Sequence, residues 1–149
     1  MNEQEIHHLL YDIPENVDYT DISQELDLED VSKERVDKLR DLLHSDDLAV
    51  RFDAALLLTN WGVEDGLNTL IDLFEKGETK GFIPHHLHPY DDTNKHILDA
   101  LIGYWASQTD LHKEQEARKR IYPTIISIIK QAVHSAYSIA QIGFLIKKI

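Results

Sequence analysis

From residue 32 to residue 77, apolar residues recur at the spacing of amphipathic helices. The pattern predicts three helices, at about residues 33–43, 48–60 and 64–76. Ser32 and Asp47 can cap the amino ends of the first two helices, while Gly62 and Gly77 can end the second and the third. The middle helix is apolar nearly all round, so we expect it to be buried.

The rest of the chain also has helical spacing, interrupted by one long loop. Residues 77–92 contain two glycines and two prolines, which favour a surface loop. A helix should resume near Thr93, turn at residues 107–110 and continue as an exposed helical stretch. Pro123 predicts a new or kinked helix at that point, and a last helix is expected at residues 135–147. The fold class is therefore all-α.

One stretch, residues 36–74, resembles a HEAT repeat followed by the start of its neighbour. The residues that carry the resemblance are Leu39, Leu42, Leu43, Asp46, Asp47, Val50, Arg51, Ala54, Ala55, Leu58, Gly62, Leu67 and Leu70. A HEAT-like chain of this length implies a short right-handed solenoid of about three helical hairpins. The helices at 95–105 and 135–147 would belong to further repeats, although both lack the Val-Arg pair. The resemblance implies a concave face that binds a protein or, occasionally, a nucleic acid.

The same residues also have a direct physical reading. Ala54 and Ala55 are small enough to let two helices approach closely. Arg51 can reach the acidic turn or the carbonyl ends of a neighbouring helix. Gly62 permits the left-handed conformation that reverses the chain. Trp61 and Trp105 lie near the ends of inner helices, so we expect both to pack in the core.

The charge of the chain is acidic and unevenly distributed. The 149 residues carry a net charge of −12, from 15 lysines and arginines against 27 acids. Residues 1–30 hold ten of these acids and no lysine or arginine, so they account for −10 of the net charge. We therefore divide the chain into an acidic N-terminal arm, residues 1–31, and a HEAT-like helical repeat domain, residues 32–149. The arm is expected either as a solvated, partly disordered segment or as short helices docked on the first repeat.

The composition excludes several classes of protein. No cysteine is present, which rules out disulfides and thiolate metal sites. No apolar run approaches the length of a membrane span, and the first ten residues lack the features of a secretion signal. A strongly acidic field repels nucleic acid and anionic membranes, and it attracts basic proteins. We expect a cytoplasmic protein that binds neither nucleic acid nor membrane.

One cluster in the sequence is suggestive of metal chemistry, and it consists of His85, His86, His88, Asp91 and Asp92. Three imidazoles and two carboxylates could bind zinc or manganese, but no HExxH or His-Asp motif accompanies them. The chain also lacks a GxSxG motif and a glycine-rich phosphate loop. The paired acids at 46–47 and 91–92 are better explained as helix caps than as catalytic carboxylates. We therefore assign no catalytic residue, no metal and no cofactor.

Small size, absent cysteine, strong acidity and a helical scaffold together resemble the small acidic immunity proteins of bacterial toxin systems. The resemblance implies a cytoplasmic inhibitor that neutralises a toxin. Toxic nucleases need basic clefts to hold phosphates, so a pre-organised acidic surface can block such a cleft and associate fast. The residues that we assign to partner binding are Asp18, Tyr19, Asp21, Glu25, Asp27, Glu29 and Asp30.

Two alternatives to an immunity protein remain open. A HEAT-like adaptor or assembly scaffold would hold its partner in the concave groove and would tolerate charge reversal on the arm. A metal-dependent enzyme would instead be built around the histidines and acids of residues 85–92.

Overall fold

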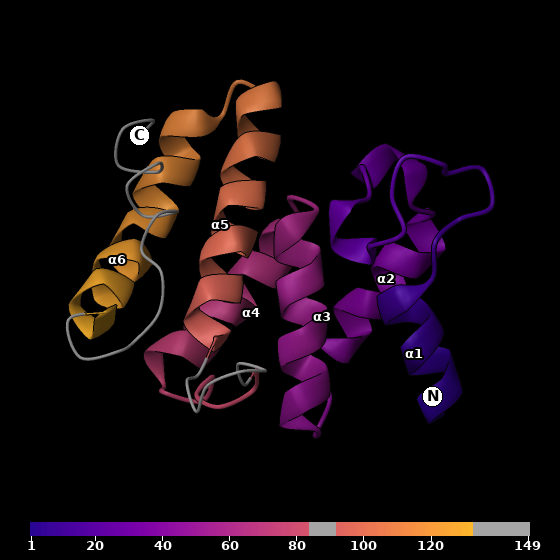
Figure 1. The fold of residues 1–149 in the computed structure, drawn as a ribbon, viewed down its shortest axis with the longest axis horizontal. Coiled ribbons are helices and arrows are strands. Elements are labelled where there is room, and N and C mark those ends of the chain that lie inside the picture. The colour runs from indigo at the N-terminus through magenta and orange to yellow at the C-terminus, as the bar shows by residue number, and fades with distance from the viewer. Residues whose placement is uncertain (84–91, 133–149) are drawn as a thin grey trace.

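A computed structural model describes residues 1–83 and 92–132, and over these residues the fold is all-helical (Figure 1). The α-helices in this part are α1 (Glu3–Tyr11), α2 (Lys33–Leu42), α3 (Leu48–Asn60), α4 (Glu64–Glu75), α5 (Thr93–Asp110) and α6 (Glu114–Ala132). Two short 3-10 helices, η1 (Ser23–Glu25) and η2 (Leu28–Asp30), lie between α1 and α2. None of the described helices is both long and apolar enough to cross a membrane. The helix expected at residues 135–147 lies outside the described residues.

The sequence signals that delimit α2, α3 and α4 act as predicted. The Ser32 hydroxyl accepts a hydrogen bond from the backbone N–H of Arg35 at 3.1 Å and so caps α2. The Asp47 carboxylate accepts from the N–H groups of Ala49 and Val50 and caps α3. Gly62 has φ +84, which is the left-handed conformation expected where the chain leaves α3.

α3 is the central helix of the described fold. On one side it packs against α1, α2 and η1, which precede it in the chain. On the other side it packs against α4 and α5, which follow it (Figure 1). The apolar residues from Phe52 to Leu58 are all buried, whereas Leu48, Ala49 and Val50 in the first turn are partly buried or exposed. This arrangement confirms that the middle helix is buried, as its apolar composition predicts.

Glycines on the neighbouring helices bring them close to α3. A Cβ atom added to Gly66 of α4 would lie 2.4 Å from Leu58 Cβ, and one added to Gly103 of α5 would lie 3.1 Å from the Asn60 carbonyl oxygen. Ala54 and Ala55 of α3 are themselves fully buried. The absence of a side chain at Gly66 and Gly103 therefore allows the backbones of α4 and α5 to approach α3.

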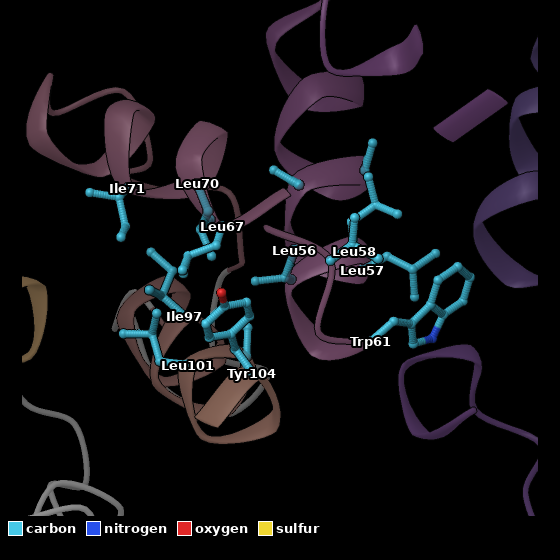
Figure 2. Close-up of a cluster of buried hydrophobic side chains, with 14 of the residues drawn as sticks. Leu56, Leu57, Leu58, Trp61, Leu67, Leu70, Ile71, Ile97, Leu101 and Tyr104 are labelled. Atoms are coloured by element: carbon cyan, nitrogen blue, oxygen red, sulfur yellow. The ribbon is translucent and has the colours of Figure 1, made fainter. Parts of the chain in front are cut away.

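The two halves of the core meet different surfaces of α3. Figure 2 shows Leu67 and Leu70 of α4 facing Leu101 of α5, with Tyr104 beside them. Trp61 follows the last turn of α3 and points the other way, toward the N-terminal part of the chain (Figure 2). It is 2% exposed, which confirms its predicted core position, and Trp105 packs half-buried against the same core.

One prediction about the second half of the chain is wrong, and one of the two alternatives at Pro123 is excluded. The turn predicted at residues 107–110 is helical, because α5 continues to Asp110 and the chain turns afterwards, where His112 has φ +60. α6 is one helix that runs through Pro123, so no new helix begins there. Pro123 and Lys119 are both exposed, so water can hydrate the Lys119 carbonyl that Pro123 cannot bond.

Candidate functional site

The acidic segment, defined here as residues 18–30, contains all seven residues assigned to partner binding. It includes η1 and η2 and lies against the end of α3 (Figure 1). How this segment is held, and what it leaves exposed, determines what it can bind.

Trp61 anchors the acidic segment to α3. Its indole Nε1 donates a hydrogen bond of 2.9 Å to the backbone carbonyl of Ser23, at the start of η1. The Ser23 hydroxyl in turn donates to the Leu10 carbonyl at 2.7 Å. Ser23 is 3% exposed, so both bonds are shielded from water. α3, η1 and α1 are therefore joined by two buried hydrogen bonds.

Arg35 of α2 forms a second anchor, on the carboxyl end of α1. Its Nε donates to the Leu9 carbonyl at 2.9 Å and its Nη1 to the Asp12 carbonyl at 2.8 Å. A cation is favourable at this end of a helix, where backbone carbonyls lack helical partners. Burial lowers the pKa of the Arg35 guanidinium, and the Asp12 carboxylate opposes that shift. The group nevertheless stays protonated at neutral pH.

Arg35 also meets Trp61, so the two anchors touch. The guanidinium carbon lies 5.4 Å from the centroid of the Trp61 ring, within the range of a cation–π contact. Nη2 of Arg35 is buried and has no hydrogen-bond partner in the described part of the chain. The face of the Trp61 ring is therefore an electrostatic partner for the Arg35 guanidinium, whose Nη2 has no oxygen to bond among the described residues.

Tyr19 organises the acidic segment from within. Its hydroxyl donates to the Asp30 carboxylate at 2.8 Å and accepts from the backbone N–H of Asp27 at 2.9 Å. The hydrogen bond from the Asp27 N–H lowers the pKa of Tyr19. Desolvation and the carboxylates of Asp30 and Asp27 together outweigh that effect, so the pKa of Tyr19 is raised overall. The hydroxyl therefore stays protonated and can donate to Asp30. The Thr20 hydroxyl similarly donates to the Glu25 carboxylate at 2.9 Å.

The carboxylates of the acidic segment have no counter-ion within the described residues. Asp18, Asp21, Glu25, Asp27 and Glu29 are exposed, and Asp30 is partly buried and accepts the hydrogen bond from Tyr19. The ion pairs of the described chain all lie elsewhere: His8–Asp12, Lys38–Glu34, Arg40–Asp37, Arg40–Asp65, Arg51–Glu78 and Lys76–Asp72. The negative charge of the segment is thus directed to solvent.

Large apolar side chains are exposed among these acids. Of the seven exposed large hydrophobic residues in the described structure, five lie in residues 1–28: Met1, Tyr11, Tyr19, Ile22 and Leu28. Exposed aromatic and aliphatic groups beside charged ones supply contact area at protein interfaces. The acidic segment therefore offers both charge and apolar surface.

Four of the five residues suggestive of metal chemistry are outside the part of the chain that the structure describes. These four are His85, His86, His88 and Asp91. Within residues 1–83 and 92–132, no group of three or more histidines or acids is arranged to hold a metal ion. The His7–His8 pair is exposed, and His8 Nδ1 lies 2.9 Å from Asp12.

The paired acids considered as caps behave differently from each other. Asp47 caps α3, as described above, so that interpretation is confirmed. Asp92 occupies the N-cap position of α5, but its side chain accepts no capping hydrogen bond, so the capping part of the interpretation is wrong for it. The backbone near Asp92 is held instead by its own N–H, which donates to the Ile83 carbonyl at 2.7 Å.

Two features of α3 are not found by reasoning from the sequence alone. The sequence favours a contact of Arg51 with the acidic turn or with helix carbonyl ends, whereas its Nη2 lies 3.9 Å from the Glu78 carboxylate. Asp53 is a partly buried acid in α3, and desolvation, with the charge of Asp47 adding to it, raises its pKa. No periodic pattern marks Asp53, because its burial depends on tertiary contacts.

Comparisons with protein-family models, with curated proteins and with solved structures find no match for this chain. The role of the acidic segment therefore has to be inferred from its own geometry and charge.

Proposed function

We propose that this chain is a non-catalytic protein-binding module, and specifically an immunity protein that neutralises a basic toxin in the cytoplasm. The partner is a toxin domain, such as a nuclease, whose basic cleft is covered by the acidic segment. Residues 32–149 would serve as the scaffold, in the form of a short HEAT-like right-handed solenoid.

The observation that carries the proposal is the absence of an internal counter-ion at the acidic segment. Asp18, Asp21 and Glu29 are exposed and form neither a hydrogen bond nor an ion pair within the described residues. Concentrated charge of one sign accelerates association with a surface of opposite charge. It also repels nucleic acid, so a basic protein is the favoured partner.

Order within the segment supports the same proposal. Tyr19 fixes Asp30 and the Asp27 backbone, and Trp61 fixes Ser23, so the acids are displayed on a shaped surface. A surface that is ordered before binding loses less conformational entropy when it binds. The exposed side chains of Ile22 and Leu28 add apolar contact area between the acids.

Capture of the partner from native lysate tests the proposal. The tagged protein is incubated with lysate at low and at high salt, and the bound proteins are identified by mass spectrometry. We expect one basic, toxin-like protein, with capture that weakens as salt screens the charges. Its toxic activity should be inhibited by the purified chain at a fixed stoichiometry.

Charge reversal locates the binding surface. The triple variant Asp18→Lys, Asp21→Lys, Glu29→Lys should lose capture and inhibition, because it inverts the unpaired charges without removing a hydrogen bond.

A matched control changes net charge by the same amount at distant exposed positions. In the control, Asp41→Lys, Glu75→Lys and Asp110→Lys should keep both capture and inhibition. Equal loss in the two variants would indicate an effect of net charge alone. Capture that survives charge reversal of the segment would refute the proposal and favour an adaptor that binds elsewhere.

A further inference from the structure

A pocket of about 630 Å³ adjoins the acidic segment. It is formed by the end of α1, the turn that follows it and the start of α2, and Asp30 of the acidic segment lines one side. This volume lies within the range of sites that hold small ligands. The pocket therefore has room for a long side chain together with part of the backbone that carries it.

The wall of the pocket includes an apolar strip. Leu9, Ile13 and Pro14 line it, and all three are only partly buried. Long basic side chains place their aliphatic stems along such surfaces and keep the charged head near polar groups. The strip thus suits the stem of a basic residue.

The acids around the pocket outnumber its cations. Five carboxylates line it, against the side chains of Arg35 and Lys38. Both cations are already engaged, since Lys38 pairs with Glu34 at 3.1 Å and Arg35 donates to two backbone carbonyls. Glu15, by contrast, is exposed and forms no hydrogen bond or ion pair within the described residues.

We propose that this pocket binds an arginine side chain presented by the basic partner. The inference rests on the proposed function, because it identifies one contact of the same binding surface. The planar guanidinium can donate to two carboxylate oxygens at once, while the ammonium of lysine acts as a single point charge. Glu15 is the free carboxylate available to receive it. The stem of the arginine lies along Leu9 and Ile13.

Titration with a small probe tests the pocket without the partner. N-acetyl-arginine amide is added to the isotope-labelled full chain, and amide and methyl NMR signals are followed. We expect saturable shifts in residues 5–15 and 30–38, with a Kd on the order of 1 mM for so small a ligand. Nuclear Overhauser contacts should join the arginine methylenes to the methyl groups of Leu9 and Ile13.

Matched probes separate the contributions of charge and stem. N-acetyl-norleucine amide keeps an aliphatic side chain but has no charge, and it should not saturate the site. N-acetyl-lysine amide should bind several-fold more weakly than the arginine amide. Equal binding of all three probes, or shifts spread over the whole acidic surface, would overturn the proposal.

Variants at single acids complete the test. Glu15→Gln, in an exposed turn, should weaken binding of the arginine amide by about three- to tenfold, because a paired carboxylate is lost. Glu75→Gln makes the same change at an exposed acid that neither lines the pocket nor belongs to the acidic segment, and it should leave binding of the arginine amide unchanged. If partner capture succeeds while the arginine amide fails to bind, only this inference is refuted. If the amide binds and no basic partner is captured, the proposed function fails instead.

Discussion

The indole of Trp61 donates its hydrogen bond to the backbone of Ser23, 38 residues earlier in the chain, at 2.9 Å. This bond joins the end of the central helix to a segment that has the composition of a solvated arm. Ten acids without a basic residue predict repulsion and extension. Hydrogen bonds from Trp61 and Arg35 to backbone carbonyls of residues 9–23 offset that repulsion and hold this part of the chain against α2 and α3.

Removal of the indole donor should destabilise the fold. Trp61→Phe keeps most of the apolar volume but leaves the Ser23 carbonyl buried without a partner, which costs about 1–3 kcal/mol. Urea unfolding measures the loss. The control Trp105→Phe changes a half-buried indole that forms no hydrogen bond from its side chain in the described structure, so a smaller loss is expected. Equal losses for the two variants would contradict the role of the Ser23 bond.

Arg35 should control how firmly α1 is held. Arg35→Lys keeps the charge but cannot reproduce the fork that serves the Leu9 and Asp12 carbonyls. We expect faster amide hydrogen exchange in residues 3–12, with exchange in α4 unchanged. The comparison variant Arg40→Lys alters an exposed arginine that pairs with Asp37 and Asp65, and such pairs contribute about 0–1 kcal/mol. If α1 exchanges equally slowly in both variants, Arg35 is not its anchor.

Gly66 should be intolerant of even a methyl group. Gly66→Ala would place Cβ 2.4 Å from Leu58 Cβ, so α4 and α3 would have to separate. Overpacking of this kind costs about 1–3 kcal/mol, and a gain in helix propensity of up to about 1 kcal/mol only partly offsets it. Thermal unfolding should show a lower midpoint.

Gly77→Ala is the comparison for that variant. Gly77 has φ +71 but nothing within 4 Å of an added Cβ, so its substitution isolates the cost of the left-handed backbone. That cost is about 1–2 kcal/mol. The loss of stability expected for Gly66→Ala has a different cause, which is a steric clash at an ordinary helical backbone. A Gly66→Ala protein as stable as the parent would show that the helices can separate without loss.

Asp53 should make stability depend on pH. Its pKa is raised in the folded state by desolvation and by Asp47, so folding favours the protonated form. Its destabilising effect is therefore absent below the ordinary pKa of an aspartate, about 4, grows as pH rises toward the raised value, and is complete above it. Asp53→Asn should raise the thermal midpoint at pH 7, and the difference from the parent should vanish at pH 3. A difference that persists at pH 3 would assign the effect to packing instead of charge.

Helices whose boundaries depend on local signals are predictable from this sequence. Ser32 and Asp47 act as caps because their side chains need only nearby N–H groups, so α2 and α3 begin where the pattern places them. Residues 107–110 look like a turn because they are polar. They are helical in the structure, and Gln108 packs back toward the end of α3, where its Nε2 donates to the carbonyl of Gly62, 46 residues earlier, at 3.2 Å. No local pattern reveals such partners.

The candidate site shows the same difference between features set by local sequence and features set by tertiary contacts. The acids and Tyr19 can be selected from the sequence, because charge and composition are local properties. Their anchoring cannot, since it depends on Trp61 and Arg35, which lie far along the chain from the carbonyls that they bind. The role of the pocket beside α1 is equally non-local, because α1 and α2 form it together.

The anchors bond to main-chain oxygens. Trp61 binds the carbonyl of Ser23, and Arg35 binds those of Leu9 and Asp12, so these contacts are indifferent to which side chains the neighbouring positions carry. Exposed residues such as Asp18, Asp21 and Glu29 can therefore be substituted without a change in the backbone conformation. Successive substitutions at exposed positions, in evolution or in design, could in this way redirect the surface to a new ligand without changing the backbone fold.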